Sequence, residues 1–384
     1  MPKNKVHVKN GSTLIVDIGS ASVGAAVISK GKLGVPQLNE VTRVPIGLGS
    51  PSSREALTTH TEEALKKLLE HYITTPIKKI NVVVSAPWHE ASIRTITSTS
   101  QKPVNISERT AVSAVQKYQN EKPPHEGNVD VEAVAVQMRV NGYSTSLKKM
   151  VSGTSISINL YESEMRSNLQ KKFTSIIESA FPNSSVHFNT FPLASTVALR
   201  TISESTGFIV TDIAGEATEV SIVHEDGLRH IASFPVGYYS VARKIGASQD
   251  KIGDAMSRLA LLARGELTPE EAANVKKEFS EVFKEWMASF EDVIRAASQN
   301  FPIPRTLYLL SDKEPLSWLK LGIEEVNTFS LHVVPAGAPL VQTHVETGDN
   351  AHYDVFLSLE ALFFHIGKDA LVGEDKELGV VYSR

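Results

Sequence analysis

Cysteine is absent from the 384 residues of the chain. This absence excludes a disulfide framework, thiol catalysis and zinc sites built on thiolates, and it fits a cytosolic protein. Long apolar runs are also lacking: one of the longest, 359–366, is far shorter than the roughly 20 residues of a membrane-spanning helix. No apolar stretch of signal-peptide length follows the lysines within residues 1–10. We therefore expect any contact with a membrane to go through a partner.

A strong net charge is lacking as well, because the formal net charge is only −4. The chain therefore has no bulk electrostatic attraction toward nucleic acid, and no nucleic-acid partner is expected. Hydrophobic residues make up 41% and charged residues 21% of the sequence, which is ordinary for a globular protein. A chain of 384 residues is too long for one small core and suits two domains.

Two segments about half a chain apart share one pattern. An apolar strand over 14–16 leads into Asp17-Ile-Gly, and another over 208–210 leads into Asp212-Ile-Ala. Each continues through small residues into a second β-rich run. Two such strand–turn–strand units suggest two related domains.

The residues between these units predict a compact insert of mixed α and β structure over 87–161. Helices are expected before and after it, over 61–72, 162–181 and 192–203. Beyond the second unit, Thr268-Pro-Glu-Glu271 has the sequence of a capping box, which predicts the start of a long helix that runs to about Gln299.

The first unit, Asp17-Ile-Gly-Ser-Ala-Ser22, has the residue types of a phosphate-binding hairpin. A strand-end carboxylate such as Asp17 can hold Mg²⁺, usually through water. Gly19 lets backbone N–H groups approach phosphates closely, and Ser20 and Ser22 can donate further hydrogen bonds. The same residues also suit an ordinary β-hairpin with a Gly-Ser turn, so this segment alone leaves both interpretations open.

The second unit, Asp212-Ile-Ala-Gly-Glu-Ala-Thr218, repeats the pattern in a matching strand context. A nucleotide held between two domains needs a phosphate hairpin from each. A repeated motif is much less frequent by chance than a single one. The pair of units therefore favours a nucleotide site over two unrelated hairpins.

With these motifs in place, the sequence resembles the FtsA and PilM group of actin-like ATPases, the cell-division actin homologue and the type IV pilus assembly protein. The segment 16–23 looks like the first phosphate loop of both, and 211–218 looks like the second. The insert that follows Val84-Ser-Ala-Pro87 and the helix at 192–199 match the group's insert and inter-domain connecting helix in order. The order of parts covers nearly the whole chain.

The resemblance implies an α/β, two-domain actin-like (ribonuclease H-like) ATPase fold with a small α+β insert. The first domain would comprise 1–86 and 162–205, with the connecting helix in the latter, and the insert 87–161. The second domain would comprise 206–246 and 304–340, its helical subdomain 247–303, and a closing segment, 341–384, would return to the first domain.

The resemblance also implies ATP and Mg²⁺ between the two domains. The residues expected to bind them are Asp17, Gly19, Ser20, Ala21, Ser22, Asp212, Ala214, Gly215, Thr218 and Ser311. Of these, Asp17 and Asp212 would hold Mg²⁺ through water.

Three departures from the group's pattern fall on this site. Glu216 stands where a small or neutral residue is expected, and a carboxylate aimed at phosphates is repulsive unless it points outward. Ser311-Asp312 replaces the paired glycines of the adenine site. The connecting helix lacks an acidic or amide residue to orient water, although Asn189 precedes it, so no catalytic residue is assigned. Together they predict weakened binding, slow hydrolysis, or a fold kept for scaffolding.

The leading hypothesis is a cytoplasmic scaffold that binds ATP–Mg²⁺, hydrolyses it slowly or not at all, and recruits a protein partner. The resemblance implies a peptide of an inner-membrane pilus protein, a division-ring protein, or self-association. Residues 367–384 lack the sustained apolar face of an FtsA-like membrane helix, so recruitment to the inner membrane face would depend on the partner. The alternatives are an active ATPase or small-molecule kinase of the same superfamily, and a nucleotide-free adaptor.

Overall fold

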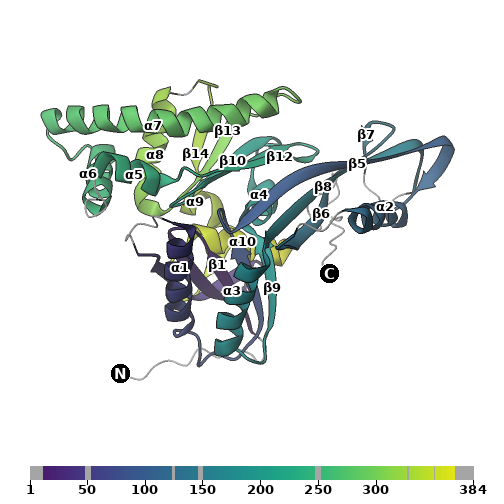
Figure 1. Ribbon diagram of the computed structural model, residues 1–384, viewed down its shortest axis with the longest axis horizontal. Helices are drawn as coiled ribbons and strands as arrows, with labels where there is room; N and C mark the ends of the chain where they lie inside the picture. Colours follow the sequence, from purple (N-terminus) through teal and green to yellow (C-terminus); the bar gives the residue numbers. More distant parts are fainter. Residues whose placement is uncertain are drawn as a thin grey trace.

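The structure is a computed structural model that describes residues 12–47, 53–122, 126–145, 150–246, 252–326, 328–349 and 351–367. The expectations for residues 1–10 and 368–384 lie outside these ranges. Three sheets organise the chain (Figure 1).

The first sheet has the strand order β15-β3-β2-β1-β4-β9. Its strands are β1 (Ser12–Ile18), β2 (Ser22–Lys30), β3 (Pro36–Pro45), β4 (Ile77–Val84), β9 (Ser185–Thr190) and β15 (Glu346–Thr347). The second sheet has the order β12-β11-β10-β13-β14. Its strands are β10 (Phe208–Ile213), β11 (Thr218–His224), β12 (Gly227–Phe234), β13 (Thr306–Leu310) and β14 (His332–Pro335).

The two sheets repeat one topology. In each, the first strand pairs antiparallel with the second and parallel with the fourth, as β1 does with β2 and β4 and β10 does with β11 and β13. Apart from the added edge strand β15, both sheets place their strands in the order third, second, first, fourth, fifth. The duplication predicted from the two strand–turn–strand units is therefore confirmed by the pairing.

Helices divide the molecule into layers. α4 (Phe191–Ile202) and α10 (Val355–Ile366) pack against each other in a core shared by the two sheets. The far face of the first sheet is covered by α1 (Arg54–Leu69) and α3 (Ser167–Ala180). The far face of the second sheet is covered by α5 (Tyr238–Gly246), α6 (Ile252–Arg264), α7 (Pro269–Ser298) and α8 (Lys313–Val326). A short helix, α9 (Ala338–Val341), joins the shared core.

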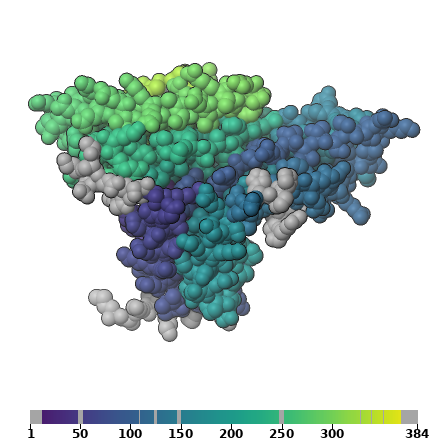
Figure 2. All heavy atoms as spheres, in the orientation of Figure 1, coloured from purple at the N-terminus to yellow at the C-terminus, as the bar shows by residue number. Residues whose placement is uncertain are grey.

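The third sheet forms the insert, with the order β5-β8-β6-β7. It comprises β5 (His89–Ile106), β6 (Asn128–Val140), β7 (Tyr143–Ser144) and β8 (Val151–Arg166), with α2 (Glu108–Glu121) packed on it. In Figure 2 the insert, in blue, projects from the body of the molecule beside the green second domain. It contacts β12: Gly227 lies against the backbone of Val136, and Arg139 pairs with Asp226 at 2.7 Å.

Local signals at helix starts account for several elements. The capping box at α7 is confirmed, because Thr268 Oγ1 accepts from the Glu271 amide at 3.4 Å and Glu271 Oε2 accepts from the Thr268 amide at 3.1 Å. The predicted start of the first helix at residue 61 is wrong. α1 begins at Arg54, where Ser53 Oγ accepts from the Ala56 amide at 3.2 Å.

The helix predicted over 162–181 is partly wrong, because residues 162–166 belong to β8 and α3 begins only at Ser167. β8 is paired on both sides, with β5 and β6. Glu162 is also held by the Tyr118 hydroxyl at 2.9 Å and the Lys122 ammonium at 3.2 Å. Pairing between distant strands overrides the local helix preference here.

The contact of the insert with β12 gives a test of the fold. Gly227 has φ +135°, and a Cβ built on it would lie 2.2 Å from the carbonyl oxygen of Val136. We expect Gly227→Ala to lower the free energy of unfolding by about 2–4 kcal/mol, through backbone strain and a clash that cannot relax. Urea denaturation measures this.

The control for that experiment is Gly253→Ala on α6, where nothing lies within 4 Å of the added Cβ. It should leave stability unchanged or raise it by up to about 1 kcal/mol. Equal effects of the two substitutions would contradict the described contact of β12 with the insert.

Candidate functional site

The two predicted phosphate hairpins face each other and touch. Asp17 lies near the end of β1 and Asp212 near the end of β10. The turns match: the Gly19 amide donates to the Ser22 carbonyl at 3.1 Å, and the Ala214 amide donates to the Ala217 carbonyl at 3.0 Å. The hairpins are joined directly, because the Glu216 amide donates to Ser20 Oγ at 3.0 Å.

The start of α5 closes on the second hairpin. The amides of Tyr238 and Tyr239 donate to the carbonyls of Ala214 and Gly215 at 3.0 and 2.9 Å. A Cβ on Gly237 would lie 2.3 Å from the Ala214 carbonyl oxygen, so only glycine permits this approach. Helix N-terminal amides are common anion sites, but these two are already satisfied by the loop.

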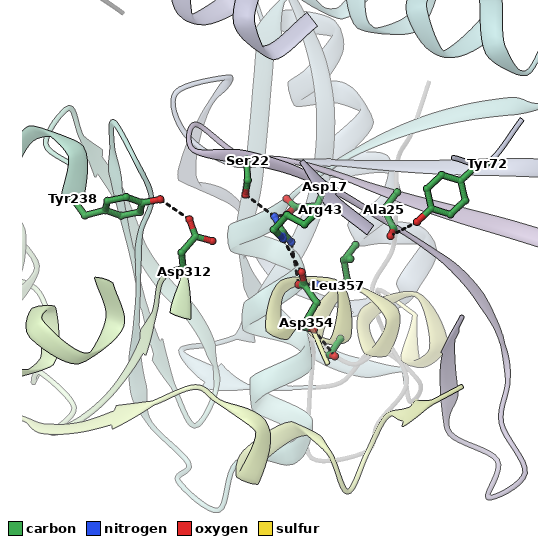
Figure 3. Close-up of polar contacts among 10 residues, drawn as sticks. Asp17, Ser22, Ala25, Arg43, Tyr72, Tyr238, Asp312, Asp354 and Leu357 are labelled. Atoms are coloured by element: carbon green, nitrogen blue, oxygen red, sulfur yellow. Dashed lines mark hydrogen bonds and ion pairs between the residues drawn. The ribbon is translucent and has the colours of Figure 1, made fainter. Parts of the chain in front are cut away.

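Arg43, on β3, occupies the position beside Asp17. Its Nη1 lies 2.8 Å from Asp17 Oδ2 and donates to Ser22 Oγ at 2.9 Å. Its Nε and Nη2 form a bidentate pair with Asp354, at 2.7 and 3.0 Å (Figure 3). The guanidinium carbon lies 5.2 Å from the centre of the Phe356 ring. The guanidinium is thus engaged by two carboxylates, a hydroxyl group and an aromatic ring of the protein.

Gly24 makes this arrangement possible. Asp17 is the cross-strand partner of Gly24, and Gly24 is the cross-strand partner of Arg43. A Cβ at position 24 would lie 2.8 Å from Arg43 Nη2 and 2.9 Å from Cζ. The guanidinium therefore crosses the middle strand where that strand has no side chain.

The carboxyls around Arg43 titrate differently. Burial raises the pKa of Asp17 to about 6, although Arg43 opposes this. Burial also acts on Asp354, but the guanidinium of Arg43 and the Leu357 amide outweigh it and hold its pKa below the usual range. Glu360, on α10, is fully buried, and burial with the nearby Asp17 charge raises its pKa well above normal. The charge of one guanidinium thus acts to lower the pKa of all three acids.

A second buried group lies between the hairpins and the base of the insert. Glu219, on β11, accepts from the Ala86 amide at 2.9 Å and lies 3.1 Å from Nε2 of His89. Burial disfavours a charged His89, but Glu219 outweighs it and raises the histidine pKa. Burial, and then the Glu219 charge, raise the pKa of Asp212 well above its usual value. These contacts join the second domain to the first.

The departures noted in the sequence have structural explanations. Glu216 points away from the hairpins and forms a bidentate pair with Arg243, at 2.7 and 2.5 Å. Asp312 Oδ2 accepts from the Tyr238 hydroxyl at 2.5 Å (Figure 3). Asn189 donates only to the His187 carbonyl, at 3.5 Å, and does not line the space between the hairpins.

Seven of the ten residues expected at the site line one cavity between the hairpins: Asp17, Gly19, Ser20, Ala21, Ser22, Asp212 and Ala214. Gly215 packs against Tyr239 instead. Thr218 is bonded to the Val236 carbonyl and the Trp286 indole, and Ser311 to the Ile213 carbonyl. The lining residues that sequence reasoning missed are Arg43, Ser85 and Phe356.

The cavity does not fit a magnesium triphosphate. Its volume is about 20 Å³, which is room for about one water molecule, whereas ligand pockets typically hold about 300–1,000 Å³. Arg43 already neutralises Asp17, the expected metal ligand. Among the described residues, no group of three or more His, Asp or Glu side chains is arranged as a metal site.

None of the described helices is long and apolar enough to span a bilayer.

Comparisons with known proteins agree with this architecture. Protein-family profiles and curated proteins give no match. Among solved structures, the chain is similar to that of a "PilM-PilN type IV pilus biogenesis complex", with 14% identity over 93% of this chain and 98% of that chain and a TM-score of 0.60. The ethanolamine utilization protein EutJ of Carboxydothermus hydrogenoformans matches with 12% identity over 93% and 91% of the chains and a TM-score of 0.42. The chain has the two-domain actin-like ATPase fold with similarity to PilM, as predicted from the sequence.

The raised pKa of Asp212 predicts a specific dependence of stability on pH. The folded state keeps this proton to higher pH than the unfolded chain does, so its contribution is full below about pH 4 and is lost as pH rises toward the folded pKa. Relative to Asp212→Asn, the wild type should lose up to about 1.4 kcal/mol per pH unit over that interval. Denaturant unfolding of both proteins at several pH values measures the difference.

Asp226→Asn is the control of opposite sign. Burial acts against its ionisation, but Arg139 and Arg229 hold the pKa of Asp226 below normal. This substitution should therefore destabilise the protein near neutral pH, with an effect that shrinks as pH falls below about 4. A difference between wild type and Asp212→Asn that is constant with pH would contradict the assignment.

Proposed function

We propose that this chain is a cytoplasmic adaptor of type IV pilus assembly, which uses the actin-like fold to hold a segment of a protein partner at the inner membrane face. The proposal is supported by the likeness to a chain of the PilM–PilN complex, which covers 93% of this chain and 98% of that chain, and by the presence of a second protein in that complex. The partner would be an inner-membrane pilus protein that presents a short cytoplasmic peptide.

A groove where the insert meets the first domain offers a place for such a peptide. α1 and α3 lie side by side (Figure 1), and a cavity of about 170 Å³ opens between the start of α1 and the end of β8. Arg54, Arg166 and Lys172 are among the residues that line it. Arg54 is fixed by donating to the Pro87 carbonyl at 3.0 Å. The groove therefore lies on ordered elements of both parts.

The charge of this groove indicates what it would bind. Burial, and then the nearby charge of Arg166, lower the pKa of Arg54, so the two guanidinium groups repel each other. The carboxylates of Glu90 and of Glu55, which also lines the groove, offset this only in part. Lys172 adds a third cation, although Glu62 pairs with it at 2.7 Å. A peptide carboxylate placed between the arginines would relieve this repulsion and could be held by both. We therefore propose an extended peptide that carries at least one carboxylate.

Of the alternatives raised by the sequence, the geometry favours the nucleotide-free adaptor over the ATP–Mg²⁺ scaffold or an enzyme. The space between the hairpins does not fit phosphates with a metal ion. Of the acidic groups there, Asp17 is engaged by Arg43 and Glu216 by Arg243. Asp212 Oδ1 has no hydrogen-bond partner among the described residues, but burial raises the Asp212 pKa well above its usual value and so disfavours the carboxylate that would act as a base. Partner binding that requires no nucleotide is the expectation that follows.

The test is binding of synthetic peptides that cover the cytoplasmic segments of the inner-membrane pilus proteins of the source organism, followed by fluorescence anisotropy without nucleotide. One peptide should bind. Arg54→Glu combined with Arg166→Glu should weaken its binding at least about tenfold, because both arginines that would hold the peptide carboxylate are replaced by acidic residues. Added ATP–Mg²⁺ should leave the affinity unchanged.

The matched control is Lys67→Glu, which makes the same charge change as each single groove substitution, at an exposed position at the other end of α1. It should bind the peptide like the wild type. The proposal fails if none of the peptides binds, or if the control weakens binding as much as the groove variants do.

A further inference from the structure

We propose that Arg43 is a resident cation that takes the place of a nucleotide's metal ion, so that the site between the two hairpins is kept closed by the protein itself. This inference concerns a different part of the molecule from the peptide groove and does not depend on the identity of the partner. It rests on the position of Arg43, its hydrogen bonds, the small volume of the cavity and the charges that line the cavity.

Position is set by the register of three strands. Asp17, Gly24 and Arg43 form one row across β1, β2 and β3. Strands lie about 4.8 Å apart, so the side chain of Arg43 spans roughly two strand spacings to reach the strand-end carboxylate. That carboxylate is the group expected to hold Mg²⁺ in the hairpin chemistry. The missing side chain at Gly24 is what opens the path.

Hydrogen bonding leaves the guanidinium little capacity for another ligand. Nη1 serves Asp17 and Ser22, while Nε and Nη2 serve Asp354. The Arg43 side chain is 19% exposed. Desolvation acts against its charged form, but the neighbouring acids outweigh it and raise the pKa of Arg43 well above its normal value. It therefore stays charged. A phosphate would have to displace Asp354, which also caps α10 by accepting from the Leu357 amide at 3.1 Å.

Space and charge both oppose a triphosphate. The cavity has a volume of about 20 Å³, and the Ser20–Glu216 bond joins the two hairpins beside it. Arg43 is the one cation among the described residues that line it, and it is engaged by acids of the first domain. The remaining acids of the lining are Asp312 and Asp212, and burial raises the pKa of Asp212 well above its usual value. A polyphosphate would therefore find no free counter-ion among the described lining residues.

The arrangement also explains how the two halves stay closed without a ligand. Glu219 of the second domain bonds the Ala86 amide and pairs with His89 at the root of the insert. Ala21 of the first hairpin packs in the core of the second domain. These contacts, with Arg43 filling the space behind them, supply the bridging interactions that a bound nucleotide provides when it lies between two domains.

The first experiment is a titration of the wild-type protein with millimolar Mg²⁺–ATP while its thermal midpoint is followed. A ligand that binds only the folded state raises the midpoint, so a locked site predicts a shift below about 1 °C. A rise of several degrees that Asp17→Asn abolishes would overturn the proposal.

The second experiment removes the cation. Arg43→Gln should lower the midpoint by at least about 3 °C at pH 8, and the loss should shrink toward pH 5. Without the guanidinium, the folded-state pKa values of Asp17 and Glu360 rise further above their unfolded values, and Asp354 loses the attraction that holds its pKa below the usual range. Stability is therefore retained at low pH and lost as pH rises. Millimolar Mg²⁺ alone should raise the midpoint of this variant but not that of the wild type. Equal stability of variant and wild type at both pH values would contradict the role of Arg43.

Gly24→Ala gives an independent check if Arg43→Gln does not fold. The added Cβ would push against the guanidinium, so Gly24→Ala alone should lower the thermal midpoint of the wild-type protein. Where the double variant folds, Gly24→Ala should lower the midpoint of Arg43→Gln much less, because the clashing guanidinium is gone. Arg94→Gln, at an exposed position of β5, is the control and should change neither the midpoint nor the response to Mg²⁺. A Gly24→Ala protein as stable as the wild type would argue against the described path of the Arg43 side chain.

Discussion

The ion pair between Arg43 and Asp17 across Gly24 is the interaction on which the centre of this molecule depends. It joins three strands of the first sheet, and through Asp354 it joins them to the start of α10. α10 in turn packs on α4 in the core shared by both sheets. Breaking a buried pair of this kind leaves an uncompensated charge and is strongly destabilising. The same guanidinium therefore ties β1, β2 and β3 to the helix that packs in the shared core.

The acids around this pair show how the fold accommodates negative charge where an actin-like nucleotide site would lie. Asp354 stays ionised against Arg43, whereas burial favours the protonated forms of Asp212 and Glu360. Glu216 is directed outward to Arg243. Each carboxyl is thus either paired or able to keep its proton, as buried acids require. Such a centre is a structural joint between domains.

The sequence predicted the fold well because the fold is duplicated. Two strands that end in Asp-Ile, half a chain apart, predicted two hairpins, and the strand pairing confirms both. Most of the cavity lining could also be named in advance. Arg43 could not be named in advance, because its place in one row with Asp17 and Gly24 follows only from the register of β1, β2 and β3. Gly24 within a strand was the available signal, since such glycines often mark close approach of another group. Residues 162–166 were misassigned because strand pairing on both sides outweighed a local helix pattern.

The central claim is that a protein side chain, rather than a metal ion with nucleotide, fills the space between the hairpins. The most direct measurement is a crystal structure of the protein grown with millimolar Mg²⁺ and a non-hydrolysable ATP analogue. The account predicts density for the Arg43 guanidinium between Asp17 and Asp354, with the Ser20–Glu216 contact intact and no phosphate between the hairpins. Phosphates bound there, with Mg²⁺ beside Asp17 and Arg43 turned away, would contradict it.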